Sequence, residues 1–511
     1  MKKFLLSALL AAGIAGCQCP EKKEQPKAAP AAEKKAEKAP AKPAAKPAAK
    51  KAKNAKKQGK QDPLKKTPAK GAKKGAAKAK GAAPKTAAKK AAEKPARYAD
   101  IQIIGETNKS ALSYKPGEEM IFTFRVDFGK SKPGKWFLAY TRKGDDNKTF
   151  KGKAPADKLL TVKTSLDKPG FVSVTVYLVN EKGRVISYQY SRGDGRKLRR
   201  AIGYYAGAGV QAEKLRDCGE PKDFDAFWAS QKKRLAAIPF KDKVEKKLVK
   251  ETKNGYIYAV SIPAPGPRPA TGYMTVPKNA KAKSLPIYVT FFGYGTSIQK
   301  PPRNVPAGRI WFSLNAHGQK LGQNAAYYKA FFQSIRSGRY SYAFDPEQNK
   351  NRETCFFNGM VMRILRTLEY LKAQPEWNRK DLNVAGGSQG GLQTMWAAAL
   401  DQDVTEARPS ITWCCDMAGT AKAKRLHGTW RIPYVPALDY YDPVFMAKRI
   451  KKASVTITRA GLGDYTCPPS GLAISYNNLA TPRKSIRWVQ GSNHPFIPKK
   501  SEVIIWSTQK K

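Results

Sequence analysis

The sequence predicts an α/β fold with a mostly parallel sheet, preceded by a smaller antiparallel β domain. After about residue 206, apolar runs of strand length alternate with apolar runs of helical spacing, which is the pattern of an α/β domain. One strand-like run leads into Gly386-Gly387-Ser388-Gln389-Gly390, and a helix-like run follows it. Between residues 97 and 205, short runs alternate polar and apolar residues with a period of two, which predicts antiparallel strands.

The first 16 residues have the composition of a secretory signal peptide. Lys2 and Lys3 precede an apolar run over residues 4–10, and small residues follow. The segment ends in Ile14-Ala15-Gly16-Cys17, which resembles the bacterial lipobox, so we expect Cys17 to be lipidated. An ordinary signal peptide that contains a cysteine is the alternative. Gln18 after the cysteine is compatible with outer-membrane sorting, so we expect an exported cell-envelope lipoprotein at the outer membrane or cell surface.

Residues 17–97 are predicted to be a disordered tether rich in Lys, Ala and Pro. Residues 18–97 contain 26 Lys and Arg against 6 Asp and Glu, a net charge of +20, and almost no large apolar residue. Self-repulsion and the lack of buriable surface prevent a packed core. Expected partners are a membrane, through the lipid anchor, and anionic envelope polymers. No nucleic-acid partner is expected, because no aromatic residue lies between Lys22 and Lys94 to stack on bases.

The remaining chain is also basic and holds scattered cysteines. Of the total charge of +57, residues 98–511 carry +35, which suits either an acidic substrate or a merely solvated surface. The spacing of the cysteines matches neither a compact disulfide framework nor a pair of metal ligands. The adjacent Cys414 and Cys415 are expected to be buried small apolar residues rather than a bridge.

Residues 98–205 are predicted to form a β-sandwich of immunoglobulin type. The alternating runs lie at residues 121–128, 136–140, 171–179 and 185–190, with Gly, Pro, Asp and Asn between them. This domain carries no obvious chemistry. A role as spacer or docking domain is favoured, and carbohydrate binding is the alternative.

Residues 206–511 are predicted to form the α/β domain. Helical spacing is found in residues 224–238, and the later strand-like and helix-like runs alternate along the chain, at 287–292, 360–371, 382–385, 392–400, 454–459 and 485–489. About 300 residues is a plausible size for an α/β-hydrolase domain.

The segment around Ser388 has the order of a nucleophile elbow, in which a strand, a tight turn carrying serine and a helix follow one another. Glycine at 386 and 390 removes the Cβ atoms that would clash where the chain doubles back. The N–H groups at the start of the following helix would point toward an oxyanion formed at the serine. A glycine-rich strand–helix turn without catalytic meaning is the alternative.

The chain contains three histidines, which makes the search for a general base sharp. An α/β-hydrolase presents Ser, acid and His in that order, each in a loop after a strand. His317 precedes Ser388, and His427 lies outside any clear strand end, so a structural or surface role is expected for His427. His494 follows the run 485–489, and Asp464 follows the run 454–459. Ser388, Asp464 and His494 are therefore the predicted catalytic residues.

Several segments resemble the acetyl xylan esterase / cephalosporin C deacetylase family, carbohydrate esterase family 7. They are Gly386 to Gly391, Gly463-Asp464-Tyr465-Thr466-Cys467-Pro468-Pro469-Ser470, the loop from Gly491 to His494, and Asp223-Phe224-Asp225-Ala226-Phe227-Trp228. The resemblance covers most of residues 206–511. It implies an α/β-hydrolase fold and removal of acetyl groups from sugar hydroxyls, with Ser388 as nucleophile, His494 as base and then acid, and Asp464 orienting His494.

The oxyanion donors are expected at two main-chain N–H groups. That of Gln389, just after the nucleophile, follows from the elbow itself. That of Tyr294 follows from the resemblance, since Phe292-Gly293-Tyr294-Gly295 is similar to the family's His-Gly-Tyr. The chain departs from the family pattern in three places, where Phe292 replaces His, His317 replaces the Arg of Arg-Gly-Gln, and Pro495 replaces Glu.

The expected function is a serine esterase that removes acetyl groups from xylan-type oligosaccharides through an acetyl-enzyme, without metal or organic cofactor. An esterase or peptidase of another acyl specificity on the same fold is one alternative. A catalytically inactive, glycan-binding lipoprotein of the cell envelope is the other.

Overall fold

The computed structural model describes residues 97–191 and 197–508. The predicted signal peptide, the lipidation of Cys17 and most of the predicted tether lie outside the described residues. No helix in the described part of the chain is long and apolar enough to cross a membrane.

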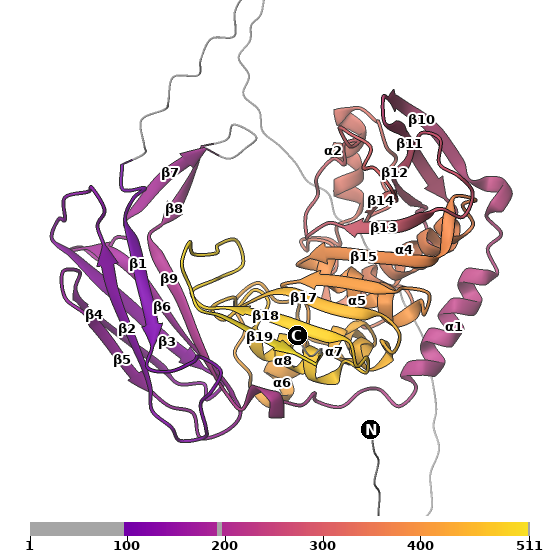
Figure 1. Ribbon diagram of the computed structural model, residues 1–511. Helices are drawn as coiled ribbons and strands as arrows, with labels where there is room; N and C mark the ends of the chain where they lie inside the picture. Colours follow the sequence, from indigo (N-terminus) through magenta and orange to yellow (C-terminus); the bar gives the residue numbers. More distant parts are fainter. Residues whose placement is uncertain (1–96, 192–196, 509–511) are drawn as a thin grey trace, which may run out of the picture. The chain divides into compact units, whose positions relative to one another are not determined.

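The N-terminal part of the described chain consists of antiparallel strands (Figure 1). One sheet has the order β1-β2-β5, a second has the order β4-β3-β6-β9, and β7 and β8 form a separate hairpin. The strands are β1 (Gln102–Thr107), β2 (Met120–Asp127), β3 (Trp136–Gly144), β4 (Thr149–Pro155), β5 (Leu160–Thr164), β6 (Gly170–Asn180), β7 (Ser187–Ser191), β8 (Lys197–Ala201) and β9 (Gly203–Val210).

One apolar core fills the N-terminal part and draws on both larger sheets. Alternate residues of β2, including Phe122 and Phe124, are fully buried beside Val172 and Val174 of β6. The period of two in the sequence reflects this burial of one face of each strand. The predicted strand runs at 121–128, 136–140, 171–179 and 185–190 all coincide with or overlap strands.

The C-terminal part is built on a mixed sheet whose strands, within the described residues, follow the order β10-β11-β12-β14-β13-β15-β16-β17-β18-β19. The central strands from β14 to β18 are parallel, and antiparallel strands lie at both edges. The strands are β10 (Glu245–Thr252), β11 (Gly255–Ile262), β12 (Ala270–Pro277), β13 (Leu285–Phe291), β14 (Ile310–Asn315), β15 (Trp377–Gly387), β16 (Glu406–Ser410), β17 (Ser454–Gly461), β18 (Lys484–Val489) and β19 (Val503–Ser507).

Helices connect and cover these strands. They are α1 (Phe224–Ala236), α2 (Ala325–Ser334), α3 (Pro346–Asn349), α4 (Phe356–Lys372), α5 (Gln389–Leu400), α6 (Gly419–Ala423), α7 (Pro443–Met446) and α8 (Pro469–Asn478), with short 3-10 turns at Ala212–Lys214, Lys241–Lys243, Pro436–Tyr441 and Ala447–Arg449. Every residue of α5 is buried, because α5 packs against β15 and β16 on one side and against α4 and α7 on others. A helix whose residues are small or apolar on most of its surface suits such a central position.

The runs predicted for the α/β domain are confirmed. Residues 224–238, 360–371 and 392–400 correspond to α1, α4 and α5, and the runs at 287–292, 382–385, 454–459 and 485–489 correspond to β13, β15, β17 and β18. In β13 and β17 buried residues alternate with partly buried ones, so one face of each strand is the more deeply covered.

The parallel register places the carboxyl ends of neighbouring strands next to one another. Phe291 of β13 pairs with Gly386 of β15, and Gly387 pairs with Ser410 of β16. Gly461 of β17 pairs with Val489 of β18. The loops that follow β13, β15, β17 and β18 therefore emerge at one edge of the sheet, where α/β proteins place their sites (Figure 1).

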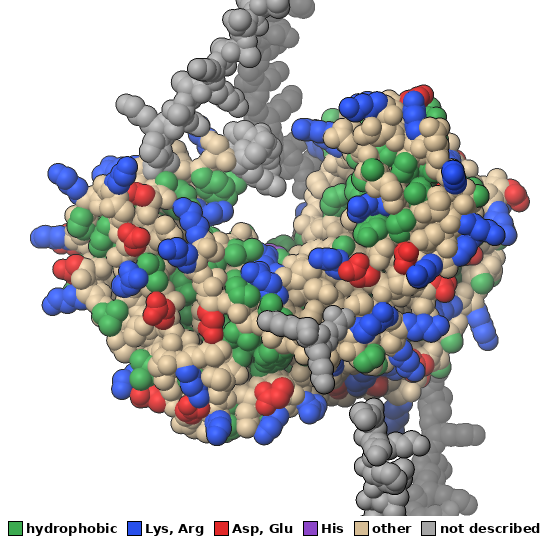
Figure 2. All heavy atoms as spheres, viewed as in Figure 1, with side chains coloured by type: hydrophobic (Ala, Val, Ile, Leu, Met, Phe, Trp, Pro, Cys, Tyr) green, Lys and Arg blue, Asp and Glu red, His purple; other side chains and the backbone are tan. Residues whose placement is uncertain are grey.

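The basic charge is distributed over the surface. On the face drawn in Figure 2, Lys and Arg side chains are spread out, with Asp and Glu side chains among them, rather than gathered in one patch. This distribution favours a general solubilising or long-range role of the charge over a single anion-binding surface on that face.

Candidate active site

Ser388 lies in the turn between β15 and α5 in a strained conformation. Its φ of 59° and ψ of −121° place a non-glycine residue in a region that L-residues rarely adopt. The Ser388 N–H donates to the carbonyl of Ser410 over 2.9 Å, and the Ser388 carbonyl accepts from Trp413 and Leu392. These main-chain hydrogen bonds hold the turn, and the serine side chain takes part in none of them.

Glycine is required on both sides of this turn, as the sequence predicts. A Cβ on Gly386 would lie 2.6 Å from the Gly390 carbonyl carbon, and a Cβ on Gly390 would clash with the Phe291 carbonyl oxygen. Strand β15, the first turn of α5 and the end of β13 can approach this closely only because both residues lack a side chain.

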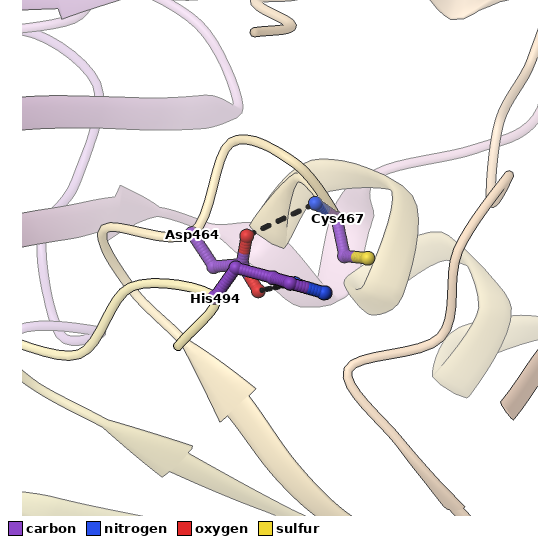
Figure 3. Close-up of side chains that lie close together, drawn as sticks. All are labelled: Asp464, Cys467 and His494. Atoms are coloured by element: carbon purple, nitrogen blue, oxygen red, sulfur yellow. Dashed lines mark hydrogen bonds and ion pairs between the residues drawn. The ribbon is translucent and has the colours of Figure 1, made fainter. Parts of the chain in front are cut away.

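Asp464 and His494 form the ion pair or hydrogen bond that the sequence predicts (Figure 3). His494 Nδ1 lies 2.9 Å from Asp464 Oδ2, and Asp464 is fully buried while the His494 side chain is 26% exposed. Asp464 Oδ1 accepts the N–H groups of Thr466 at 3.0 Å and Cys467 at 3.1 Å. Both carboxylate oxygens are thus engaged, which fixes the carboxylate, and His494 Nε2 forms no hydrogen bond with another described residue.

The structure brings Ser388 to the same sheet edge as this pair without a direct bond. Ser388 follows β15 immediately, Asp464 follows β17 by three residues, and His494 follows β18 by five. Among the hydrogen bonds of the described residues, none joins Ser388 Oγ to His494. Catalytic hydrogen bonds are often long in ligand-free sites and tighten only when a substrate is bound.

The two predicted oxyanion donors flank the serine. Gln389 is the first residue of α5, so its N–H has no partner within the helix. Tyr294 lies in the loop after β13, and neither its N–H nor that of Gln389 donates to another described residue. A Cβ placed on the neighbouring Gly293 would lie 3.9 Å from Ser388 Cβ, so this loop runs beside the nucleophile.

A hydrogen-bond network that the sequence did not indicate joins these two donors. Tyr342 donates its hydroxyl to Gln389 Oε1 over 2.9 Å and accepts the N–H of Gly295 over 3.0 Å. The ring of Tyr294 stacks on that of Tyr342 at 4.2 Å, and the Tyr294 hydroxyl donates to the Tyr342 carbonyl. Burial raises the pKa of Tyr294 to about 12 and also raises the pKa of Tyr342, so both phenols stay neutral donors near pH 7.

His317, one of the departures from the family pattern, supports the same loop. Its Nε2 lies 2.8 Å from the Gly295 carbonyl, so Nε2 carries the hydrogen, and its ring meets Tyr342 edge-on at 4.6 Å. Arg363 of α4 donates to the neighbouring Ala316 carbonyl through Nε and Nη2. Burial is the main reason that the pKa of His317 falls to about 4.

This depressed pKa predicts a pH dependence of stability. Between about pH 6.5 and pH 4, the unfolded chain binds a proton at residue 317 that the folded chain does not, so stability falls as the pH falls. The shift corresponds to about 3 kcal/mol of the free energy of unfolding. His317→Gln, which does not titrate, should lose that much less stability than the wild type on acidification. Urea denaturation at pH 7.5 and pH 4 measures this, and equal losses in both proteins would disprove the role of His317.

His427 and the cysteines other than Cys467 do not contact the Asp464–His494 pair through a hydrogen bond among the described residues. The Nδ1 atom of His427 contacts the carbonyl of the next residue, Gly428, at 3.0 Å, which fits the structural role expected for it. Cys414 and Cys415 are buried and unbridged, as expected, and so are Cys355 and Cys467, while Cys218 is a partly exposed free thiol.

Among the described residues, one group of potential metal ligands is found, and it includes the predicted acid and base, Asp464 and His494. Donor atoms of Asp464, Cys467 and His494 lie within 4.8 Å of one another (Figure 3). The Asp464 carboxylate is already bonded to His494 and to the N–H groups of Thr466 and Cys467.

The sheet order, the strained serine between β15 and α5, and the Asp–His pair at the same sheet edge define an α/β-hydrolase with a serine elbow. The family model of acetyl xylan esterase (AXE1) matches residues 213–428 and 433–510, which is more than half of the chain. The chain therefore belongs to the acetyl xylan esterase family, as the sequence motifs indicated.

One curated relative and two solved structures illustrate the similarity. The chain is 28% identical over 285 residues to acetyl esterase Axe7A of Xylanibacter ruminicola, which covers 52% of this chain and 62% of that relative. The chain thus spans less than two thirds of the length of this curated relative. Among solved structures, it is similar to the acetyl xylan esterase of a Paenibacillus species (22% identity, TM-score 0.44, 56% of this chain and 93% of that chain). Acetyl xylan esterase 1 of a Thermoanaerobacterium species gives 20% identity, a TM-score of 0.44, and 56% and 92% coverage.

Proposed function

We propose that the chain is a serine esterase that removes acetyl groups from the hydroxyls of xylan-type oligosaccharides. The observation that carries the proposal is the buried Asp464–His494 pair at the sheet edge where Ser388 occupies a strained elbow. Membership of the acetyl xylan esterase family supports the acetyl specificity and the carbohydrate substrate.

In the proposed mechanism, Ser388 Oγ attacks the acetyl carbonyl while His494 Nε2 accepts the serine proton. Asp464 holds His494 in the tautomer with hydrogen on Nδ1 and stabilises the imidazolium that forms. His494 then gives this proton to the sugar oxygen as the bond between that oxygen and the acetyl carbon breaks, and the sugar leaves as an alcohol. Water, deprotonated by His494, hydrolyses the acetyl-enzyme and regenerates Ser388.

The developing oxyanion is proposed to bind the N–H groups of Gln389 and Tyr294. Both are free of other partners among the described residues; Gln389 follows Ser388 directly, and the loop of Tyr294 runs beside Ser388. Because Tyr342 binds the Gln389 side chain and the Gly295 N–H together, the two donors are fixed relative to each other before substrate binds. Such preorganisation is worth on the order of 10²- to 10³-fold in kcat for each donor.

Acyl-chain preference tests this function against a broader esterase. We expect acetate release from acetylated xylo-oligosaccharides, and kcat/KM for p-nitrophenyl esters that falls by at least about tenfold from acetate to hexanoate, as misfit in a closed pocket implies. Equal or greater activity on hexanoate would favour another acyl specificity. No release from any ester would favour a glycan-binding protein without catalysis.

We also propose the domain organisation and the anchor. Residues 98–205 would form an immunoglobulin-type sandwich, supported by two antiparallel sheets around one core, and residues 206–511 the esterase domain. A crystal structure with these strands paired in another order would contradict the sandwich.

Export, lipidation of Cys17 and attachment to the outer membrane or cell surface through the basic tether rest on the sequence alone. Labelled palmitate that enters the protein equally in wild type and Cys17→Ser would contradict lipidation.

A further inference from the structure

Strand β9 of the N-terminal β part contacts the loops that carry Asp464 and His494. The Gly207 N–H donates to Gln490 Oε1 over 2.9 Å, and Gln490 Nε2 donates back to the Gly207 carbonyl over 2.8 Å. The Gln490 side chain is 2% exposed and lies four residues before His494. One buried amide thus satisfies both main-chain groups of a β9 residue, as a neighbouring strand would.

Glycines line this contact on both sides. A Cβ on Gly207 would clash with the Leu462 carbonyl oxygen, and one on Gly463 would clash with the Tyr205 carbonyl oxygen. A Cβ on Gly491 would lie 2.5 Å from the Tyr204 ring, and Tyr205 also forms an isolated β-bridge with Gly491. Two backbones can pack this closely only where side chains are missing.

The two catalytic loops are also bonded to each other. The Gly463 N–H donates to the Ser492 carbonyl over 3.0 Å, one residue before Asp464 and two before His494. The Leu462 N–H donates to the carbonyl of Val489, the last residue of β18, over 3.0 Å. The loops that carry Asp464 and His494 are thus joined by main-chain hydrogen bonds, and β9 packs closely against both loops.

Further contacts attach the β part to the same region. Tyr205 of β9 meets the ring of Phe496 at 6.1 Å, and Arg200 of β8 lies over that ring at 5.6 Å. Asp145, after β3, accepts the Leu426 N–H over 2.7 Å through Oδ1 and the Phe171 N–H over 2.9 Å through Oδ2. Phe496 lies two residues beyond His494, so the β part holds the base loop on both sides of the histidine.

We propose that the N-terminal β part is a working component of the active site, in which β9, through Gln490, positions the acid and base loops for catalysis. The role goes beyond the spacer or docking function that the sequence favours, and it rests on the proposed esterase function. Gln490 is a positioning residue: it touches neither Ser388 nor substrate, and acts by fixing where Asp464 and His494 lie. A displacement of about 1 Å at such a pair is enough to cost on the order of 10²-fold in rate.

The test compares Gln490→Ala with Asn477→Ala in the full-length chain. Asn477 is a matched control, because its amide also bonds to the residues after β9, through the carbonyls of Ala212 and Leu215, but it lies at the C-terminal end of α8 and bonds to neither catalytic loop. We expect kcat for p-nitrophenyl acetate to fall about 10- to 100-fold in Gln490→Ala with KM little changed, and to change less than about twofold in Asn477→Ala. Phosphonylation of Ser388 by a fluorophosphonate should slow in parallel with kcat.

The outcomes separate the possibilities. A wild-type protein without esterase activity would contradict the proposed function itself. An active wild type, with kcat in Gln490→Ala within about twofold of the wild type, would overturn the positioning role. Equal falls in both variants, tracking equal losses of thermal stability, would also overturn it. Should Gln490→Ala fail to fold, Gln490→Met keeps the side-chain volume and loses both hydrogen bonds to Gly207; a lowered kcat supports the proposal and an unchanged kcat refutes it.

Discussion

Replacing Ser388 with alanine is expected to lower kcat for acetate release by about 10⁶-fold, the size of effect seen when a serine nucleophile is removed from an intact site. This loss is expected because no other residue of the turn from Gly386 to Gly390 has a hydroxyl that could form the acetyl-enzyme. The free energy of unfolding should change little or even rise. The Ser388 side chain forms no hydrogen bond with another described residue, and the main-chain bonds to Ser410 and Trp413 remain in the variant. Acetate released from acetylated xylo-oligosaccharides and thermal unfolding together measure both effects.

Ser454→Ala is the matched control for this variant. Ser454 is a half-buried serine at the start of β17, at the sheet edge opposite the catalytic loops. It should keep kcat within about twofold of the wild type, as surface and edge substitutions away from special features do. Comparable activity in Ser388→Ala and Ser454→Ala would exclude Ser388 as the nucleophile.

Replacing Asp464 with asparagine is expected to lower kcat by about 10⁴-fold while the fold is preserved. The asparagine oxygen can still accept from Thr466 and Cys467, so the loop should stay in place. The amide would instead offer an N–H to His494 Nδ1, which favours the tautomer whose hydrogen is on Nε2. That tautomer cannot accept the proton of Ser388, and this loss, rather than lost structure, causes the fall in rate.

A second buried aspartate serves as the control for charge removal. Asp439 is 4% exposed and accepts the Tyr434 hydroxyl over 2.9 Å, outside the catalytic loops. Asp439→Asn should cost stability, on the order of 1–3 kcal/mol for a disturbed buried hydrogen bond, with kcat within a few fold of the wild type. If Asp464→Asn kept kcat within about tenfold of the wild type, the proposed orientation of His494 by Asp464 would be wrong.

Much of the site could be predicted from sequence because its parts are local. The elbow around Ser388 is a strand, a glycine-flanked turn and a helix in succession, and each of these leaves a short-range signal. With three histidines in the chain, the position of His494 after β18 was enough to select it. The contact with Asp464 then follows from parallel strands, whose carboxyl ends meet at one edge of the sheet.

Features set by long-range packing left no such signal. Strand β10 reads Glu245-Lys-Lys-Leu-Val-Lys-Glu-Thr252 and is almost wholly exposed, since it is an edge strand held mainly by pairing with β11. The Tyr342–Gln389 bond joins residues 47 positions apart, and the Gly207–Gln490 pair joins residues 283 apart. Sequence patterns report which face of an element is buried, but they do not report which distant element covers it.

Trapping the acetyl-enzyme tests the central claim most directly. The full-length chain would be mixed with excess p-nitrophenyl acetate, quenched in acid within the first turnovers, digested and analysed by mass spectrometry. We expect one acetyl group on the peptide that contains Ser388, absent after hydroxylamine treatment and absent in Ser388→Ala. Acetate release by the wild type without an acetylated Ser388, or with the acetyl group on Cys467 or another residue, would contradict a serine esterase built on Ser388, His494 and Asp464.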